Sequence, residues 1–207
     1  MIDFDGVVVD SLDAFAAALA AACEERGIAV VRSADDVVDL LNGNVYESFR
    51  AAGVDEQGAV QLMAAAIRTL ERDLSRLRPF PGVAEAMARL GGRFDVVIVT
   101  SNSERLVHGF LAEHGITGVA AVAGVESGVS KVEKIAAVVR RYPAQRVFPF
   151  VADTAGDMRE ARAAGATPIG VGWGWHDAGH LRAAGADRVV ASPEELLELL
   201  EPSRRDG

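Results

Sequence analysis

Short apolar runs alternate with amphipathic segments over residues 94–200, and this alternation constrains the fold more than any other feature of the chain. Buried strands are expected at 94–99, 119–123, 147–151, 167–171 and 187–190. Helices are expected between them, at 104–114, 131–141, 156–164 and 177–183, followed by a last helix that Ser192 caps. Such alternation predicts a doubly wound α/β fold, in which helices cover both faces of a parallel sheet.

Residues 12–79 have a different pattern and are expected to be almost wholly helical. Apolar residues from Leu12 to Cys23 fall at helical spacing, Ser33 can cap a short helix through Leu41, and an apolar stripe from Val60 to Leu77 ends before Pro79. After a further helix that stops at 91–92, the strand pattern begins. We therefore expect an α/β core domain of residues 1–11 and 80–207, with a small all-helical cap of residues 12–79 inserted after the first strand.

Polar residues follow the apolar runs at four places. Ligands bind at the carboxyl ends of strands in parallel α/β sheets, so these residues are the first candidates for a site. The four clusters are Asp3 and Asp5; Thr100, Ser101 and Asn102; Ser130 and Lys131; and Asp153 and Asp157. We expect them to converge on one edge of the sheet.

Asp3 and Asp5 stand one residue apart, beside an apolar run and Gly6. Buried carboxylates need a cation or a hydrogen-bond network as compensation. A solvated loop with two acidic caps is the alternative interpretation, since Asp-x-Asp also recurs by accident. The other three clusters favour a bound metal ion.

This set of residues suits the cleavage of a phosphate monoester. A magnesium ion held by oxygen ligands neutralises the phosphate, and Asp3 and Asp153 can supply such ligands. Thr100 and Asn102 offer hydrogen-bond donors, and Lys131 adds a cation at a helix start. One carboxylate can attack phosphorus while a second moves the proton, so Asp3 and Asp5 can divide these tasks.

The run Asp3–Ser11, Thr100, Lys131 and the run Asp153–Asp157 resemble, in order, the four motifs of the haloacid dehalogenase superfamily. The helical insertion and the run Phe80–Val83 resemble the small-cap branch of phosphoglycolate phosphatase and β-phosphoglucomutase. The resemblance implies a Mg²⁺ cofactor, Asp3 as the nucleophile that forms an aspartyl-phosphate, and Asp5 as acid and base. It also implies a metal site of Asp3, Asp5 (through its carbonyl), Asp153 and Asp157, in which Asp157 either binds the metal itself or orients metal-bound water. We expect Thr100 and Lys131 to be catalytic together with Asp3 and Asp5, and the phosphate to be bound by Gly6, Thr100, Ser101, Asn102 and Lys131.

The expected function is a magnesium-dependent phosphatase of a small phosphorylated metabolite, either phosphoglycolate-like or a sugar phosphate. A phosphomutase of the same branch is the alternative, and a non-catalytic phosphate-binding protein of this fold is a second one. A dehalogenase is disfavoured because Asp5 is present, and carbon–halogen cleavage needs no leaving-group acid there.

The chain departs from the family pattern near its start. Only Met1 and Ile2 precede Asp3 where the family has a full strand, and Val7 and Ala152 replace the commoner threonine and glycine. A shortened central strand loses hydrogen bonds of about 0.5 to 1.5 kcal/mol each. This predicts that a chain extended upstream of Met1 melts at a higher temperature.

The composition limits the kinds of partner that the chain can bind. The net charge of −9 disfavours nucleic acid, and no apolar stretch approaches the length of a membrane span. Cys23 is the only cysteine, so no intrachain disulfide can form. We expect a cytoplasmic monomer or homodimer that acts on a small phosphate ester.

Two further sets of residues are candidates for a binding role. His176 and His180 are four residues apart, but no third ligand is evident and a metal role is not expected. Asn42, Asn44, Tyr46 and Arg50 lie where related caps carry a substrate-contacting loop.

Overall fold

A parallel sheet forms the centre of the computed structural model, which describes residues 1–43, 45–142 and 147–201. Its strands are β3 (Val96–Val99), β4 (Val119–Ala123), β5 (Pro149–Ala152), β6 (Thr167–Val171) and β7 (Arg188–Val190). β3 pairs with β4, and β6 lies between β5 and β7, in parallel register throughout. The strands expected from the sequence are thus all present, in a parallel α/β fold.

Ile2 joins the two halves of this sheet. It forms parallel bridges to Ile98 of β3 and Val151 of β5. The backbone N–H of Ile2 donates to Val97 O at 3.0 Å, and that of Asp3 donates to Val151 O at 2.8 Å. The first strand is therefore reduced to a single bridged residue in the middle of the sheet, as its short apolar run predicted.

Both neighbouring strands begin later than the sequence predicted. Strand β3 starts at Val96 rather than residue 94, and β5 starts at Pro149 rather than residue 147. Phe94 is 45% exposed and Val147 is 74% exposed. The physical reason is that the pairing of β5 with the first strand begins at Met1, whose ammonium donates to Pro149 O at 2.8 Å, and that of β3 begins at Ile2, whose N–H donates to Val97 O.

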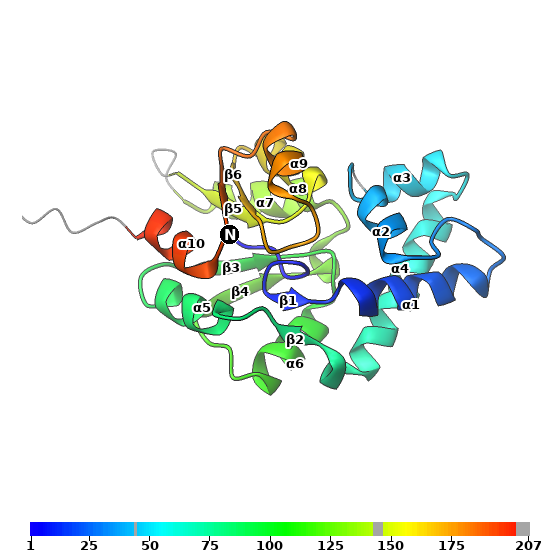
Figure 1. Ribbon diagram of the computed structural model, residues 1–207, viewed down its shortest axis with the longest axis horizontal. Helices are drawn as coiled ribbons and strands as arrows, with labels where there is room; N and C mark the ends of the chain where they lie inside the picture. Colours follow the sequence, from blue (N-terminus) through cyan, green and yellow to red (C-terminus); the bar gives the residue numbers. More distant parts are fainter. Residues whose placement is uncertain (44, 143–146, 202–207) are drawn as a thin grey trace, which may run out of the picture.

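Helices cover both faces of the sheet, as Figure 1 shows. On one face lie α7 (Lys131–Arg140), α8 (Ala155–Ala163) and α9 (Ala178–Ala183). On the other lie α5 (Val83–Gly91), α6 (Glu104–Glu113) and α10 (Pro193–Leu200). A single turn of 3₁₀-helix, Val125–Ser127, follows β4.

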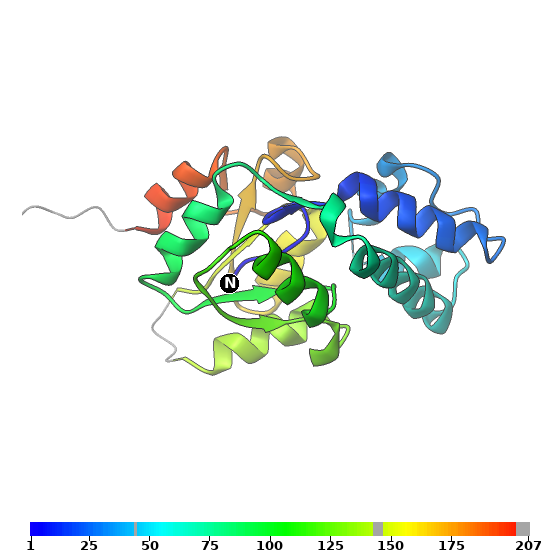
Figure 2. The ribbon, with the colours of Figure 1, turned by 90° about the horizontal axis from the view of Figure 1, so that it is seen from below.

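Four helices follow the first strand and form what we call the helical block: α1 (Leu12–Glu24), α2 (Ala34–Leu40), α3 (Val45–Ala51) and α4 (Glu56–Arg72). It lies at one end of the molecule, away from α10, in both views (Figures 1 and 2). Helices α1 and α4 pack together, with Leu19 and Leu62 fully buried. The helix expected to run to Leu77 ends earlier, at Arg72, because Asp73 leaves the helical conformation and a 3₁₀ turn, Leu74–Arg76, follows.

The chain enters and leaves the helical block side by side. Strand β1 (Val9–Asp10) pairs antiparallel with β2 (Arg78–Pro79), a short pairing that the sequence did not predict. The core packs around the same junction, where Phe4 contacts Phe110 edge to face, with ring centroids 5.3 Å apart. The chain thus passes from the sheet to the helical block and back again at one place. The division into two domains stays a prediction.

In the described part of the chain, no helix is both long and apolar enough to cross a membrane.

Candidate active site

Asp3 lies at the carboxyl edge of the sheet, directly after the bridged residue Ile2. Its carboxylate accepts hydrogen bonds from the backbone N–H of Phe4 at 2.7 Å and from Lys131 Nζ at 2.8 Å. Burial raises the pKa of Asp3 from 3.8 to about 7, although Lys131 acts in the opposite direction. Both carboxylate oxygens of Asp3 are thus held by hydrogen bonds, and the buried surroundings disfavour the negative charge of the side chain.

A tight loop turns Asp5 back toward the same edge. The carbonyl of Phe4 accepts hydrogen bonds from Val8 and Val9, and Gly6 makes the turn with φ of +71°. A Cβ at position 6 would lie 1.8 Å from Asp153 Oδ2, so only glycine allows these two segments to approach so closely.

The Asp5 carboxylate is held by neutral donors. Ser11 Oγ donates to Asp5 Oδ1 at 2.7 Å, and Asn102 Nδ2 donates to Asp5 Oδ2 at 3.1 Å. Burial raises the pKa of Asp5, while these two hydrogen bonds lower it. Asp5 therefore holds a proton more readily than an exposed aspartate does.

The segment after β3 supplies hydroxyl and amide groups. Thr100 and Asn102 are almost fully buried, and Thr100 Oγ1 accepts from the backbone N–H of Asn102 at 3.0 Å. Ser101 between them lines the same cavity as Asp3 and Asp5. Three residues whose side chains carry hydrogen-bond donors therefore line that cavity, and a local hydrogen bond holds the turn that contains them.

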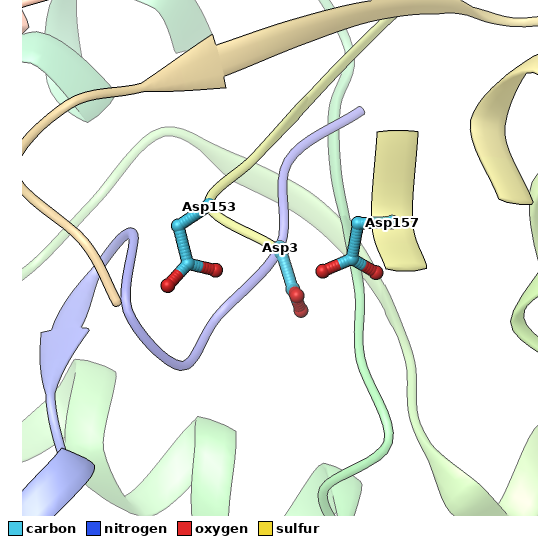
Figure 3. A group of neighbouring side chains, drawn as sticks. All are labelled: Asp3, Asp153 and Asp157. Atoms are coloured by element: carbon cyan, nitrogen blue, oxygen red, sulfur yellow. The ribbon is translucent and has the colours of Figure 1, made fainter. Parts of the chain in front are cut away.

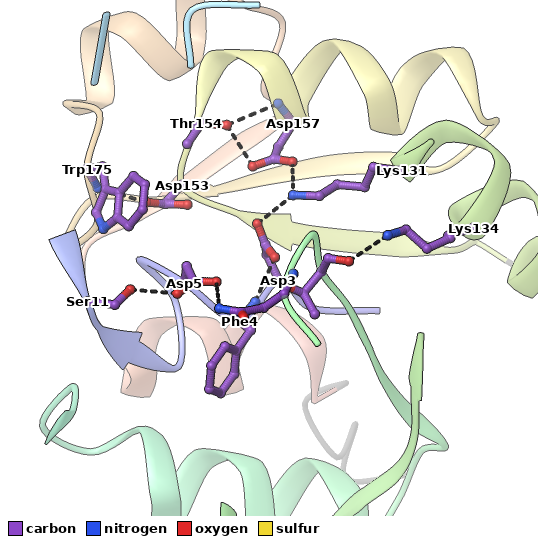
Figure 4. Close-up of polar contacts among 12 residues, drawn as sticks. Asp3, Phe4, Asp5, Ser11, Lys131, Lys134, Asp153, Thr154, Asp157 and Trp175 are labelled. Carbon is purple, nitrogen blue, oxygen red and sulfur yellow. Dashed lines mark hydrogen bonds and ion pairs between the residues drawn. The ribbon is translucent and has the colours of Figure 1, made fainter. Parts of the chain in front are cut away.

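Lys131 reaches the edge from the first turn of α7, which Ser130 caps. Its Nζ donates to Asp3 Oδ2 at 2.8 Å and to Asp157 Oδ1 at 2.5 Å (Figure 4). Burial opposes its charge, but the carboxylates of Asp157 and Asp3 outweigh burial and raise the pKa of Lys131 well above its ordinary value. The lysine is therefore held as an ammonium, and it links the segment of Asp3, 128 residues before it, to the segment of Asp157, 26 residues after it.

Asp153 and Asp157 come from the end of β5 and the start of α8. Trp175 N donates to Asp153 Oδ2 at 2.8 Å, whereas Asp153 Oδ1 is buried without a partner among the described residues. Thr154 caps α8, and its Oγ1 donates to Asp157 Oδ2 at 2.6 Å. Burial and the neighbouring charges of Asp3 and Asp157 raise the pKa of Asp153 well above its ordinary value.

Asp3, Asp153 and Asp157 form a three-carboxylate cluster, and their side chains point toward one another in Figure 3. Each offers one oxygen, and these oxygens lie within 4.8 Å of one another. Three buried carboxylates with a single lysine need more positive charge, and the orphaned Asp153 Oδ1 needs a partner. Oxygen donors of this kind suit Mg²⁺, so the residues present fit a divalent cation.

A cavity of about 70 Å³ lies over this cluster. Its sheet side is polar and includes Asp3, Asp5, Thr100, Ser101, Asn102, Lys131, Asp153, Thr154 and Asp157. The helical block contributes only apolar side chains: Phe15, Leu19, Val37, Leu40, Leu41, Val45, Met63 and Ile67. Trp175 completes the lining. One wall can thus bind an anion and a cation, and the opposite wall offers apolar contact.

The model of the haloacid dehalogenase-like hydrolase family matches residues 1–171. The chain belongs to this family. It is 30% identical over 203 residues to the phosphoglycolate phosphatase of Synechococcus elongatus, covering 96% of this chain and 94% of that one. It is 26% identical over 212 residues to the phosphoglycolate phosphatase of Chromobacterium violaceum, with the same two shares.

Two solved structures have the same fold at low sequence identity. A haloacid dehalogenase-like hydrolase of Streptococcus pneumoniae superposes with a TM-score of 0.78 at 18% identity, covering 97% of this chain and 96% of that one. A hydrolase of Pseudomonas syringae gives 0.74 at 20% identity, covering 96% and 95%. The resemblance inferred from the four polar clusters is confirmed, and the chain is a hydrolase of the family, related to phosphoglycolate phosphatases.

The structure brings together nearly all the residues that the sequence singled out. Gly6 differs, because it packs against Asp153 and does not line the cavity. Asp5 lies outside the three-carboxylate cluster, so its expected metal contact through the backbone carbonyl stays a prediction. Among the four residues expected in a substrate-contacting loop, Tyr46 lines a neighbouring pocket, Asn42 and Arg50 do not line the cavity, and Asn44 lies outside the described residues.

Sequence reasoning missed Trp175, and it considered His176 only as a metal ligand, but the structure places both residues at the site. Trp175 follows β6 and binds Asp153 through its backbone, and His176 is 1% exposed behind α8. His176 Nδ1 accepts from the N–H of Ala155 at 2.9 Å, and its Nε2 lies 3.0 Å from Val38 O. Both ring nitrogens of His176 are thus engaged with the backbone.

Proposed function

We propose that this protein is a magnesium-dependent phosphatase that hydrolyses a small phosphate monoester through an aspartyl-phosphate on Asp3. The observation that carries the proposal is the position of the Asp3 carboxylate, which lies within the three-carboxylate cluster and 2.8 Å from Lys131 Nζ. A nucleophile beside a cation and a metal site can approach a dianion that would otherwise repel it.

Asp3, Asp153 and Asp157 would hold the Mg²⁺, together with the backbone carbonyl of Asp5. When bound, the ion neutralises phosphoryl charge and fixes the orientation of the ester. Two observations support this assignment. Asp153 Oδ1 has no partner among the described residues, and a cation would bind it. Burial raises the pKa of Asp3 and of Asp153, and a cation would stabilise their charged forms. The apparent competition between Lys131 and Mg²⁺ for Asp3 is avoided if they use different oxygens, since Lys131 contacts Oδ2.

The chain's own residues divide the reaction into two steps. In the first, an Asp3 carboxylate oxygen bonds to phosphorus, the bond from phosphorus to the ester oxygen breaks, and Asp5 gives its proton to the departing alcohol. In the second, Asp5 takes a proton from water as that water attacks phosphorus, which releases phosphate and restores Asp3. The raised pKa of Asp5 supports this role, since a group that moves protons works best near the operating pH.

Lys131, Thr100, Ser101 and Asn102 would bind the phosphoryl oxygens, with Gly6 keeping the backbone of the loop close to them. The ammonium of Lys131 stabilises the charge that develops on those oxygens. The helical block would act as a cap that excludes water from the cavity, and we propose residues 12–79 as that domain.

The names of the two relatives support a phosphoglycolate-like substrate. A sugar phosphate is the other substrate expected from the sequence. In either case the partner is a small phosphate ester.

The test uses Asp3→Asn, which keeps the side-chain size and removes the nucleophile. We expect no phosphate release from p-nitrophenyl phosphate with Mg²⁺, whereas the wild type and Asp13→Asn, an exposed aspartate on α1, remain active. Mass spectrometry of the quenched wild type should find phosphate on residue 3. Retained turnover by Asp3→Asn would refute the assigned nucleophile.

The same assay separates the alternatives. Transfer of the phosphoryl group to a second sugar hydroxyl, rather than to water, would identify a phosphomutase. Binding of Mg²⁺ and phosphate without turnover of any ester would identify a non-catalytic protein.

A further inference from the structure

The described residues of the helical block present no charged side chain to the cavity. Among the residues that the structure describes, every cavity-lining side chain from α1 to α4 is apolar, including Phe15, Leu40 and Met63. This wall faces the polar sheet edge, and so it is where the alcohol part of an ester bound at Asp3 would lie.

The described residues of the site leave no side-chain cation for a second anionic group. Four carboxylates line the cavity, namely Asp3, Asp5, Asp153 and Asp157, and Lys131 is the one lysine or arginine among its described lining residues. Its ammonium already contacts Asp3 and Asp157. A carboxylate on the leaving group would therefore be buried unpaired and close to other negative charges, which is strongly unfavourable.

The wall is equally unsuited to a sugar. Its side chains offer no hydrogen-bond donor or acceptor, so the hydroxyls of a sugar would lose water without gaining partners. A neighbouring pocket of about 40 Å³ adds Tyr46 and Glu160, and again no arginine or further lysine within the described chain. Trp175 Nε1 is a buried donor without a partner there, but one neutral N–H does not balance a carboxylate.

The same surface suits an apolar group. The rings of Phe15 and Trp175 are stacked, with centroids 6.0 Å apart and an angle of 26° between their planes. Flat or branched hydrocarbon gains from contact with such rings and with Met63, which lines the same cavity. A cavity of about 70 Å³ is small, so the group is compact unless the helical block moves outward.

Resting on the phosphatase activity proposed above, we propose that the preferred substrate is the phosphate monoester of a compact, uncharged and largely apolar alcohol. Phosphoglycolate and sugar phosphates are then poor substrates, because the wall discriminates against charge and against unpaired hydroxyls. The apolar lining from the helical block is the feature that sets this preference.

The first test compares kcat/KM of the purified protein with Mg²⁺ across matched esters. Butyl phosphate and benzyl phosphate carry apolar alcohols, while phosphoglycolate, glycerol 3-phosphate and glucose 6-phosphate carry a carboxylate or hydroxyls. We expect the apolar esters to be favoured by at least about 100-fold, as burial of unpaired polar groups implies. Equal or better turnover of phosphoglycolate or of a sugar phosphate would overturn the inference.

Acetyl phosphate separates this inference from the proposed function, because its leaving group is small and departs readily. Turnover of acetyl phosphate together with a preference for phosphoglycolate would overturn the inference and leave the phosphatase intact. If no ester and no acetyl phosphate is turned over, the proposed function fails and the inference fails with it.

A variant pair tests the wall itself. Leu40→Arg places a guanidinium at a half-buried position on the cavity, and Val60→Arg places one on α4 at a position that is 40% exposed and away from it. We expect Leu40→Arg to raise kcat/KM for phosphoglycolate relative to butyl phosphate by about 10-fold or more, since arginine pairs well with carboxylates. Val60→Arg should leave that ratio unchanged, and an unchanged ratio in a folded Leu40→Arg protein would contradict the inference.

Discussion

The ammonium of Lys131 lies 2.8 Å from Asp3 Oδ2, across 128 residues of sequence. The same nitrogen contacts Asp157, so a single side chain holds the two ends of the three-carboxylate cluster together. All three side chains are almost fully buried. The pair therefore serves the fold, by neutralising buried charge, and the proposed reaction, by placing positive charge beside the nucleophile.

Replacement of Lys131 by methionine should lower both the stability of the fold and the activity. Lys131→Met leaves Asp3 and Asp157 buried without their ammonium, and breaking such a pair costs about 3 to 5 kcal/mol. We expect that loss in the free energy of unfolding at pH 8, measured by urea titration without Mg²⁺, and a smaller loss at pH 5, where Asp3, with its pKa raised to about 7, holds a proton. The activity should fall at least about 100-fold.

The control is Arg140→Met, an exposed cation at the end of the same helix. It should change neither quantity. Equal stability losses in the two variants would show that the Lys131 contacts add nothing to the folded state.

Gly6 offers a second test, because its missing Cβ leaves room for Asp153. In Gly6→Ala the new methyl would overlap the Asp153 carboxylate, and in Gly27→Ala it would meet nothing within 4 Å. Both glycines have positive φ, +71° and +67°, so both variants bear the same backbone strain of about 1 kcal/mol. We expect only Gly6→Ala to raise the Mg²⁺ concentration required for half-maximal activity. Matching Mg²⁺ curves for the two alanine variants would place Asp153 outside the metal site.

The sequence could locate this cluster because its members follow the ends of secondary-structure elements. Asp3, Thr100 and Asp153 come directly after apolar runs, and Lys131 opens a helix. In a parallel sheet the carboxyl ends of all strands share one edge, so chain order alone predicts that these residues meet. The structure brings them together there, within hydrogen-bonding distance in the case of Lys131 and Asp3.

Other features depend on contacts that no local pattern encodes. Where β3 and β5 begin is set by the backbone of Met1 and Ile2 between them, and so Phe94 and Val147 are exposed although their sequences are typical of strands. The position of His176 likewise requires α2 to dock on α8. Periodicity predicts which face of a helix is buried, but not which segment will cover it.

The pKa of Asp3 gives a prediction about pH. Burial raises it from 3.8 to about 7, so between these values the folded protein binds more protons than the unfolded chain. The contribution of Asp3 to stability is therefore fully present below 3.8 and is lost as the pH rises through about 7. Without metal, the melting temperature should fall over this interval, and Asp3→Asn should flatten that part of the profile.

Mg²⁺ should reverse the trend, because it binds the deprotonated carboxylates. We expect the rise in melting temperature caused by Mg²⁺ to grow as the pH passes through about 7, measured by thermal denaturation with and without the ion. The buried, proton-retaining Asp153 acts in the same direction. An equal Mg²⁺ effect at pH 5 and pH 9 would argue against Asp3 as a ligand.

His176 connects the helical block to the start of α8, which carries Asp157. Since its Nδ1 accepts the N–H of Ala155, the ring hydrogen is on Nε2 and is donated to Val38 O at 3.0 Å. His176→Phe keeps a ring of similar size and removes both bonds, which leaves a buried N–H and a carbonyl unsatisfied. We expect a loss of about 1 to 3 kcal/mol in the free energy of unfolding.

The same substitution should loosen the apolar wall over the cavity and raise KM more than it lowers kcat, because His176 contacts no reacting atom in the proposed mechanism. His176→Gln retains one donor and one acceptor and should recover part of both losses. His180→Phe replaces an exposed neighbour, with ring centroids 4.9 Å apart, and should change neither. If His176→Phe lowers kcat and leaves KM unchanged, His176 acts on the chemistry at Asp153 through their backbone contact, and not on the position of the helical block.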